Sequence, residues 1–364
     1  MSADLNTAAT RGFAYEALPG RVVFGPGSAR CDLAEAVAAL GVERLLLIAA
    51  APEAALADEL AAPLGERVVG RFDGVRPHVP VEAGAAAVAA ARAANADAVF
   101  SVGGGSTTGT AKAVALATGL PIVAVPTTYA GSEMTPVWGS TEGGTKTTGR
   151  DLKVLPRLVV YDPELTTSLP AAITAASGMN ALAHCVEALY APGRNPLTSV
   201  IALEASGALA RALPGAVAAP ADLGARSEAL YGAYLAGSAF AVAGSGLHHK
   251  ICHALGGAFD LPHAATHSVV LPHVVSFQQP ATGAEMDRVA AALGAAPGGA
   301  AAALFDLAAG LGVPLSLAAI GMPADGADQV VDAIVTAVPA DNPRPVDADG
   351  VRAILAGAYA GERP

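Results

Sequence analysis

Short apolar runs alternate with alanine-rich stretches along the first 162 residues of this chain of 364 residues. The runs are rich in Val, Leu and Ile, as strands are, and Gly, Pro or charged residues bound them. The stretches between them, such as 28–40 and 81–96, have the length and the alanine content of helices. Alternating strands and helices predict a parallel sheet covered by helices. We expect strands at 21–24, 44–49, 67–72, 97–103, 121–126 and 157–162.

The pattern changes after Asp162-Pro163, where turn residues mark a break. The rest of the chain consists of long segments rich in Ala and Leu with few β-branched runs, which predicts helices. A chain of this length is longer than one hydrophobic core usually fills, so two domains are expected. The sequence therefore predicts an α/β domain of the dinucleotide-binding type over 1–162 and an all-α domain over 163–364.

Composition limits the cellular setting of the protein. Hydrophobic residues make up 53% of the chain, but Gly, Pro or charge interrupts each apolar stretch before the roughly 20 residues of a membrane helix. The N-terminus lacks the basic start and apolar run of a secretory signal. Three cysteines without CxxC spacing favour a reducing compartment, and a net charge of −11 argues against nucleic acid or an anionic membrane as partner. We expect a cytoplasmic protein.

Three glycines follow the expected strand at 97–103, in the segment SVGGGSTTG at 101–109. Glycines let a phosphate approach the backbone, and the N–H groups and positive dipole at the start of the next helix attract the anion. A tight strand-to-helix turn without a ligand is the alternative. The candidate pyrophosphate-binding residues are Gly103, Gly104, Gly105, Ser106 and Thr107.

A second polar loop, PTTYAGSEMTP at 126–136, follows the next expected strand and offers the hydroxyls of Thr127, Thr128 and Ser132. Carboxyl ends of neighbouring parallel strands meet at one edge of a sheet, so both loops can touch the same dinucleotide. A polar surface turn is the alternative. The first strand-to-helix turn, at 49–52, has no GxGxxG and no acidic residue that would oppose a 2′-phosphate, so NADH and NADPH are both expected.

Histidines cluster in the second half of the chain. Asn180 and His184 are four residues apart, as are His249 and His253, so each pair shares one face of a helix. His263 follows Pro262 in a turn. Imidazoles in this arrangement could bind a metal or line an active site, although histidines packed in a core are the alternative. Six of the eight histidines belong to the cluster: His184, His248, His249, His253, His263 and His267.

These segments together resemble the iron-containing alcohol dehydrogenase superfamily. Its pattern is GGGS, a PTT…GSE loop, a G-x-D-A-x-x-H helix, and H-x-x-x-H followed by a Pro-His turn. The resemblance implies that His184, His249 and His263 occupy three of the four metal-ligand positions, and that His253 occupies the position often assigned to proton transfer. It also implies a dinucleotide site made of Gly104, Gly105, Ser106, Thr127, Thr128 and Ser132.

The chain departs from the superfamily pattern at Asn180, where metal-using members have an aspartate. An amide oxygen is a neutral and weaker ligand than a carboxylate, so we expect that no metal is required. This departure, the His248-His249 pair and FDLPHAATH at 259–267 resemble the maleylacetate reductase branch. The other segments that carry this likeness are YEALPGRVVFGPGSA at 15–29, VRPHVPVE at 75–82, GGTKTTGRD at 143–151 and DNPRPV at 341–346.

The resemblance to this branch implies reduction of the carbon–carbon double bond of maleylacetate to 3-oxoadipate with NADH or NADPH, in bacterial degradation of aromatic and chloroaromatic compounds. Charge then develops on a delocalised enolate, which histidine donors can stabilise without a metal, and His253 is the first choice for the general acid. The catalytic candidates are His253, His249, His184 and His263.

The implied substrate is a dianion, so cationic or donor groups must meet its carboxylates. We expect these groups to include His78, Asn180, Lys153 and Arg344, with Lys146, Arg150 and Lys250 as further candidates. A homodimer is expected. Two alternatives stay open: a metal-dependent alcohol or polyol dehydrogenase in which Asn180 still binds the metal, and a dinucleotide-binding protein that has lost catalysis.

Overall fold

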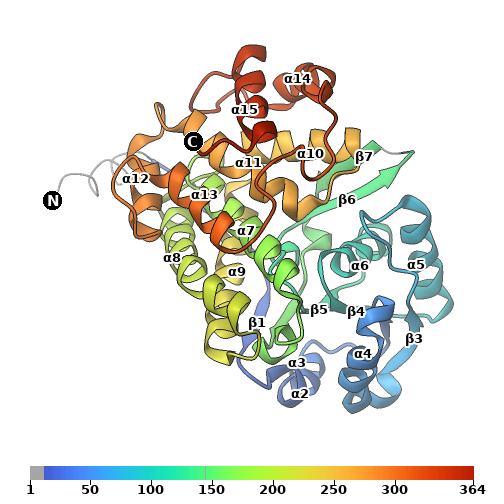
Figure 1. The fold of residues 1–364 in the computed structure, drawn as a ribbon. Coiled ribbons are helices and arrows are strands. Elements are labelled where there is room, and N and C mark those ends of the chain that lie inside the picture. The colour runs from blue at the N-terminus through green and yellow to red at the C-terminus, as the bar shows by residue number, and fades with distance from the viewer. Residues whose placement is uncertain (1–11, 144) are drawn as a thin grey trace. The chain divides into compact units, whose positions relative to one another are not determined.

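A computed structural model describes residues 12–143 and 145–364 of the chain. It divides the chain into two compact units (Figure 1). The α/β unit contains residues 19–170 and 219–230. The helical unit contains residues 12–18, 171–218 and 231–364.

The α/β unit is built on a sheet of six parallel strands in the order β1-β8-β5-β4-β2-β3. Each strand lies within one of the expected runs, so the predicted parallel sheet is confirmed. Strands β2, β4, β5 and β8 are buried along their whole length, which explains their continuous apolar sequences. The strands are β1 (Arg21–Phe24), β2 (Leu45–Ile48), β3 (Val68–Phe72), β4 (Ala98–Gly103), β5 (Ile122–Pro126) and β8 (Leu158–Tyr161).

Helices follow the strands as expected, with one difference. The stretch 28–40, expected to be helical, forms two short helices separated at Asp32. Helices α5 and α6 pack side by side (Figure 1), with Gly84 of α5 close to Ala113 of α6. The helices are α2 (Ser28–Cys31), α3 (Leu33–Ala38), α4 (Ala54–Ala61), α5 (Val81–Ala93) and α6 (Gly105–Thr118), with 3-10 turns η1 (Ala51–Glu53), η2 (Ala62–Arg67), η3 (Ser132–Met134), η4 (Leu152–Val154) and η5 (Pro163–Thr166).

A second, two-stranded sheet in this unit was not predicted from the sequence. Strands β6 (Val137–Glu142) and β7 (Thr145–Arg150) form an antiparallel hairpin. Their sequences, VWGSTE and TKTTGR, lack the clear alternation of apolar and polar residues that predicts a strand. The hairpin is joined to the segment before α5 by a hydrogen bond from Thr141 Oγ1 to the carbonyl of His78, 2.9 Å long.

The helical unit confirms the prediction of a helical second half. Its helix α11 packs against α7, α10, α13 and α15 (Figure 1). Helix α8 is long and apolar enough to cross a membrane, but half of its apolar window is buried in the protein, as in an ordinary core helix. The helices are α7 (Ala171–Ala188), α8 (Pro196–Ala218), α9 (Leu223–Ala243, of which residues from 231 belong here), α10 (Leu247–Phe259), α11 (His263–Gln278), α12 (Gly283–Ala292), α13 (Ala300–Gly310), α14 (Gly326–Ala337) and α15 (Ala348–Ala360).

One buried histidine, His273, lies on the side of α11 that meets α15. A Cβ added at Gly357 of α15 would lie 2.9 Å from His273 Nδ1, so the two helices are in close contact there. Among the described residues, His273 Nε2 has no hydrogen-bond partner. Burial lowers the pKa of His273 to about 4.

This burial predicts that His273 makes stability depend on pH. The unfolded chain protonates this imidazole below about pH 6.5, whereas the folded protein keeps it neutral until about pH 4. The free energy of unfolding is therefore unaffected by His273 above pH 6.5, and it decreases as the pH falls from 6.5 toward 4. We expect a His273→Gln variant to take up about one proton fewer on unfolding in this interval. Urea unfolding from pH 7.5 to 4.5 measures the difference, and identical pH dependence in both proteins would contradict it.

Candidate active site

The GGGS segment forms the turn between β4 and α6. Gly103 has φ 146°, and a Cβ there would lie 2.6 Å from Thr107 Oγ1, so the turn itself requires glycine at this position. Gly104 precedes the first turn of α6 with extended backbone, and Ser106 follows within that turn. The first N–H groups of a helix have no partner within it, so this end of α6 can accept an anion.

The PTT loop lies directly beside the GGGS turn, as the sequence analysis expected. The N–H of Thr127 donates to the carbonyl of Gly103, 3.2 Å away. A Cβ added at Gly104 would lie 3.0 Å from Thr128 Cγ2, and one at Gly105 would lie 3.4 Å from Ala130 Cβ. The structure therefore brings the predicted dinucleotide residues of both loops together, while their binding role stays a prediction.

Two buried tyrosine hydroxyls take part in hydrogen bonds that hold the PTT loop in place. The Tyr129 hydroxyl accepts a hydrogen bond from Arg226 Nη1 at 3.2 Å. The Tyr161 hydroxyl of β8 donates to Glu133 Oε1 at 2.6 Å. Thr128 and Ser132, which belong to the same loop, remain partly exposed and can present their hydroxyls to a ligand.

The predicted cationic residues are spread over both units. His78 is partly buried, in the left-handed region with φ 59°, and Lys153 is exposed on η4. Arg344, in the helical unit, donates to the carbonyl of Phe277 at 2.6 Å and lies 4.0 Å above the Phe277 ring. The side chain of Lys146 lies outside the described residues. Contact of any of these groups with a substrate carboxylate stays a prediction.

Three helices of the helical unit bring the four predicted catalytic histidines together. His184 of α7 stacks on His249 of α10, with ring centroids 5.2 Å apart. His253, one turn after His249, has its ring 5.9 Å from the His249 ring and 6.4 Å from that of His263 at the start of α11. Asn180 is buried on α7, one turn before His184. The spacing in the sequence thus predicted a real cluster.

Two residues of this site were missed from the sequence, Glu187 and Phe240. Glu187 is fully buried, and its carboxylate accepts hydrogen bonds from the backbone N–H of His249 at 3.2 Å and from His249 Nδ1. Burial raises the pKa of Glu187. Phe240 of α9 packs against the rings of His184 and His249, with centroids 4.6 and 4.5 Å away. Glu187 follows His184 by three residues on one helix face, which is the signal that could have identified it.

A second layer of buried groups lies behind the catalytic histidines. His248 Nε2 and His267 Nδ1 share a hydrogen bond of 2.9 Å, and Cys252 Sγ is 3.7 Å from His248 Nε2. Burial, with the neighbouring histidines, lowers the pKa of His184 and of His248 to about 3 and that of His267 well below its usual value. These three imidazoles are therefore neutral at physiological pH.

The histidines and cysteine that lie close enough together to share a metal ion are not the residues at the family's metal-ligand positions. Donor atoms of His248, Cys252 and His267 all lie within 4.8 Å of one another. Over residues 12–143 and 145–364, His184, His249 and His263 do not form a group this close. The fourth family position, Asn180, offers a neutral amide, and the nearby carboxylate of Glu187 is already held by His249.

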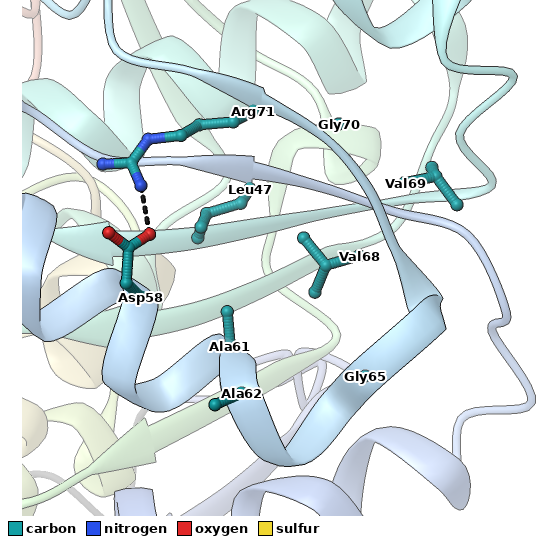
Figure 2. A pocket seen from close by; sticks show the side chains of 9 residues that line it. All are labelled: Leu47, Asp58, Ala61, Ala62, Gly65, Val68, Val69, Gly70 and Arg71. Carbon is teal, nitrogen blue, oxygen red and sulfur yellow. Dashed lines mark hydrogen bonds and ion pairs between the residues drawn. The ribbon is translucent and has the colours of Figure 1, made fainter.

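A hollow of about 460 Å³ opens elsewhere in the α/β unit, between α4, η2 and the edge strand β3 (Figure 2). Small apolar residues line most of it, and Arg71 forms an ion pair with Asp58 at its side (Figure 2). Predicted site residues are absent from its lining. The hollow is therefore separate from the dinucleotide site predicted at the ends of β4 and β5.

Comparison with known proteins places the chain in a family. The model of iron-containing alcohol dehydrogenase matches residues 19–163, and that of the C-terminal part of the Fe-containing alcohol dehydrogenase family matches residues 174–359. The chain belongs to the iron-containing alcohol dehydrogenase family. This result confirms the family resemblance and the predicted fold class.

Similar proteins within the family are maleylacetate reductases. The chain is 50% identical to the maleylacetate reductase of Sphingobium indicum over 97% of its own length and 99% of that protein. It is 48% identical to the maleylacetate reductase of Burkholderia cepacia, with the same coverage. The crystal structure of maleylacetate reductase from Agrobacterium tumefaciens is 47% identical, covers 98% of this chain and 100% of its own, and superposes with a TM-score of 0.92.

The GGGS turn yields a prediction for cofactor binding. A Cβ at Gly105 meets only Ala130, at ordinary contact distance, so the fold can accept a side chain there more easily than at Gly103. We expect a Gly105→Val variant to fold but to bind NADH more weakly by roughly two orders of magnitude, because the side chain blocks approach of the pyrophosphate. Calorimetry measures the affinity, and circular dichroism controls for folding. Unchanged affinity in the folded variant would remove this turn from the site.

Proposed function

We propose that this chain is a maleylacetate reductase, which reduces the carbon–carbon double bond of maleylacetate to 3-oxoadipate in the degradation of aromatic compounds. The observation that carries the proposal is the cluster of His184, His249, His253 and His263 beside Asn180, in a chain that matches maleylacetate reductases along nearly its whole length. Similarity to relatives named for this reaction supports the substrate, and the histidines supply the donors that the reaction needs.

The cofactor is a nicotinamide dinucleotide, which supplies a hydride when bound in its reduced form. We assign its pyrophosphate to the GGGS turn and the start of α6, with Thr127, Thr128 and Ser132 of the PTT loop as further donors. Residues 49–51, after β2, are all alanine. Because no carboxylate there opposes a 2′-phosphate, we propose that the enzyme accepts both NADH and NADPH.

The histidine cluster handles the charge and the proton. After hydride addition, negative charge spreads over the enolate of the substrate, and hydrogen-bond donors aimed at its oxygen stabilise it. His249 is suited to this task, because Glu187 holds one side of its ring and fixes its orientation. A general acid must then protonate carbon, and we assign this step to His253.

We propose that this chemistry needs no metal. Asn180 gives the family's fourth metal position no negative charge, so a divalent iron there would lack the charge compensation that a carboxylate ligand provides. The amide of Asn180 can instead hydrogen-bond the substrate. An enolate is less basic than the alkoxide of an alcohol dehydrogenase, so its stabilisation requires less than a Lewis acid provides.

The remaining expectations concern the substrate carboxylates and the setting of the enzyme. We assign carboxylate binding to His78, Lys153, Arg344 and Asn180, since a dianion needs donors at both ends. We also propose a homodimer that works in the cytoplasm without nucleic acid or membrane partners. The net charge of −11 agrees with the exclusion of polyanionic partners.

The proposal predicts metal-independent reduction of maleylacetate. Protein treated with a chelator and shown by elemental analysis to be metal-free should oxidise NADH and NADPH with maleylacetate, and should show little activity with simple alcohols or aldehydes. Absorbance at the nicotinamide band measures the rate. Activity that disappears on chelation and returns with iron or zinc would instead establish a metal-dependent dehydrogenase.

A second prediction concerns the proton donor. Replacing His253 by Asn should lower kcat by roughly 10²- to 10⁴-fold, the usual effect of losing a general acid, with little change in NADH affinity. Single-turnover oxidation of NADH separates the chemical step from binding. A wild-type chemical rate in this variant would give His253 a packing role. A larger loss in His249→Asn or His263→Asn would move the proton donor to that residue.

A further inference from the structure

Lys112 is a buried lysine that neither the sequence motifs nor the proposed chemistry explain. It lies on α6, seven residues after Gly105, and only 1% of its surface is exposed. Few lysines are buried to this degree in proteins, because removing an ammonium group from water is costly unless strong partners replace the water. The partners of Lys112 therefore indicate its role.

All the hydrogen-bond partners of Lys112 come from the end of the PTT loop and the start of β6. Its ammonium group donates to the carbonyl of Ser132 at 2.7 Å and to that of Val137 at 2.6 Å. It also contacts the carbonyl of Thr135 at 2.9 Å and Thr135 Oγ1 at 3.1 Å. Four oxygens thus surround one ammonium group, and hydrogen bonds from a charged donor are about twice as strong as neutral ones.

The PTT loop is therefore fixed to the β4–α6 segment at both of its ends. At its start, the Thr127 N–H donates to the carbonyl of Gly103. At its end, Lys112 holds the carbonyl of Ser132 and both oxygens of Thr135. Between these attachments, Thr128 and Ser132 are partly exposed beside the GGGS turn. Burial lowers the pKa of Lys112 to about 7, and the buried Glu133, one residue after Ser132, opposes this shift.

We propose that Lys112 is a positioning residue for the dinucleotide, which holds the PTT loop in register with the GGGS turn so that both can bind one cofactor molecule. This inference rests on the proposed function only in taking these loops as the cofactor site. If Lys112 had a purely structural role, its replacement would lower the stability of the protein but would not specifically weaken NADH binding.

The test compares three variants with a matched control in the same unit. Lys112→Met removes every donor, and Lys112→Gln keeps a shorter neutral donor. Thr135→Val removes the hydroxyl that accepts from Lys112, donates to the carbonyl of Ser132 and accepts from the N–H of Val137, with little change in side-chain volume. The control is Asp97→Asn, because Asp97 accepts hydrogen bonds from the backbone N–H groups of Glu43 and Arg44 at the opposite, amino end of β4. Loss of the Asp97 carboxylate should lower the stability of the protein without changing the position of the PTT loop or the GGGS turn.

NADH affinity is measured by calorimetry, and KM and kcat by steady-state assay. We expect the NADH dissociation constant and KM to rise about 10- to 100-fold in Lys112→Met, less in Lys112→Gln and about threefold in Thr135→Val, with kcat at saturating NADH within about threefold of wild type. Asp97→Asn should leave NADH affinity unchanged even where its melting temperature falls.

Wild-type NADH affinity in folded Lys112→Gln and Thr135→Val proteins would overturn the proposal, even if Lys112→Met failed to fold. An equal loss of affinity in Asp97→Asn would also overturn it, because general destabilisation would then explain the effect. Calorimetry with NADH requires no second substrate. A wild-type protein that binds NADH but does not reduce maleylacetate would therefore contradict the proposed function and leave this inference standing.

Discussion

Glu187 is a carboxylate with no exposed surface, and the helical unit must supply hydrogen bonds to it. The backbone N–H and the ring of His249, 62 residues later in the chain, do so. The first turn of α10 must therefore lie against α7. A Cβ at Gly246, just before α10, would lie 3.2 Å from Glu187 Oε1 and 3.1 Å from the Tyr190 ring, so a larger residue there would hinder this approach. The stacking of His249 on His184 follows from this arrangement.

The α/β unit uses buried polar groups in the same way. Lys112 and Glu133 are both almost fully buried, and Tyr161 connects Glu133 to strand β8. These attachments hold a loop that has little apolar surface of its own. In both units, a charge that cannot be left unpaired gives polar segments a defined position, which hydrophobic packing alone would not provide.

The electrostatics of the histidine cluster are consistent with a reaction that generates modest charge. Burial lowers the pKa of His184, His248 and His267, so these rings are neutral at physiological pH, and the nearby Asn180 is an uncharged amide. The Asn180 position therefore carries no fixed negative charge. The one carboxylate in the cluster, Glu187, is turned toward His249, where it orients the ring.

The amino-acid sequence by itself determined the six strands of the parallel sheet, the main helices and the positions of the two loops expected to bind the dinucleotide. Each of these features depends on neighbours within a few residues, such as an apolar run that ends at Gly or Pro. The spacing of His249 and His253, one helical turn apart, is local in the same way. The sequence could not show the strand order or the β6–β7 hairpin, whose polar sequence has no distinct period. Only the tertiary structure paired Glu187 with His249, His248 with His267, and Lys112 with the PTT loop. Such pairings depend on how distant helices and loops pack, because any suitable donor or acceptor that the fold brings near can pair with a buried charge. Local sequence patterns do not show which donor or acceptor that is.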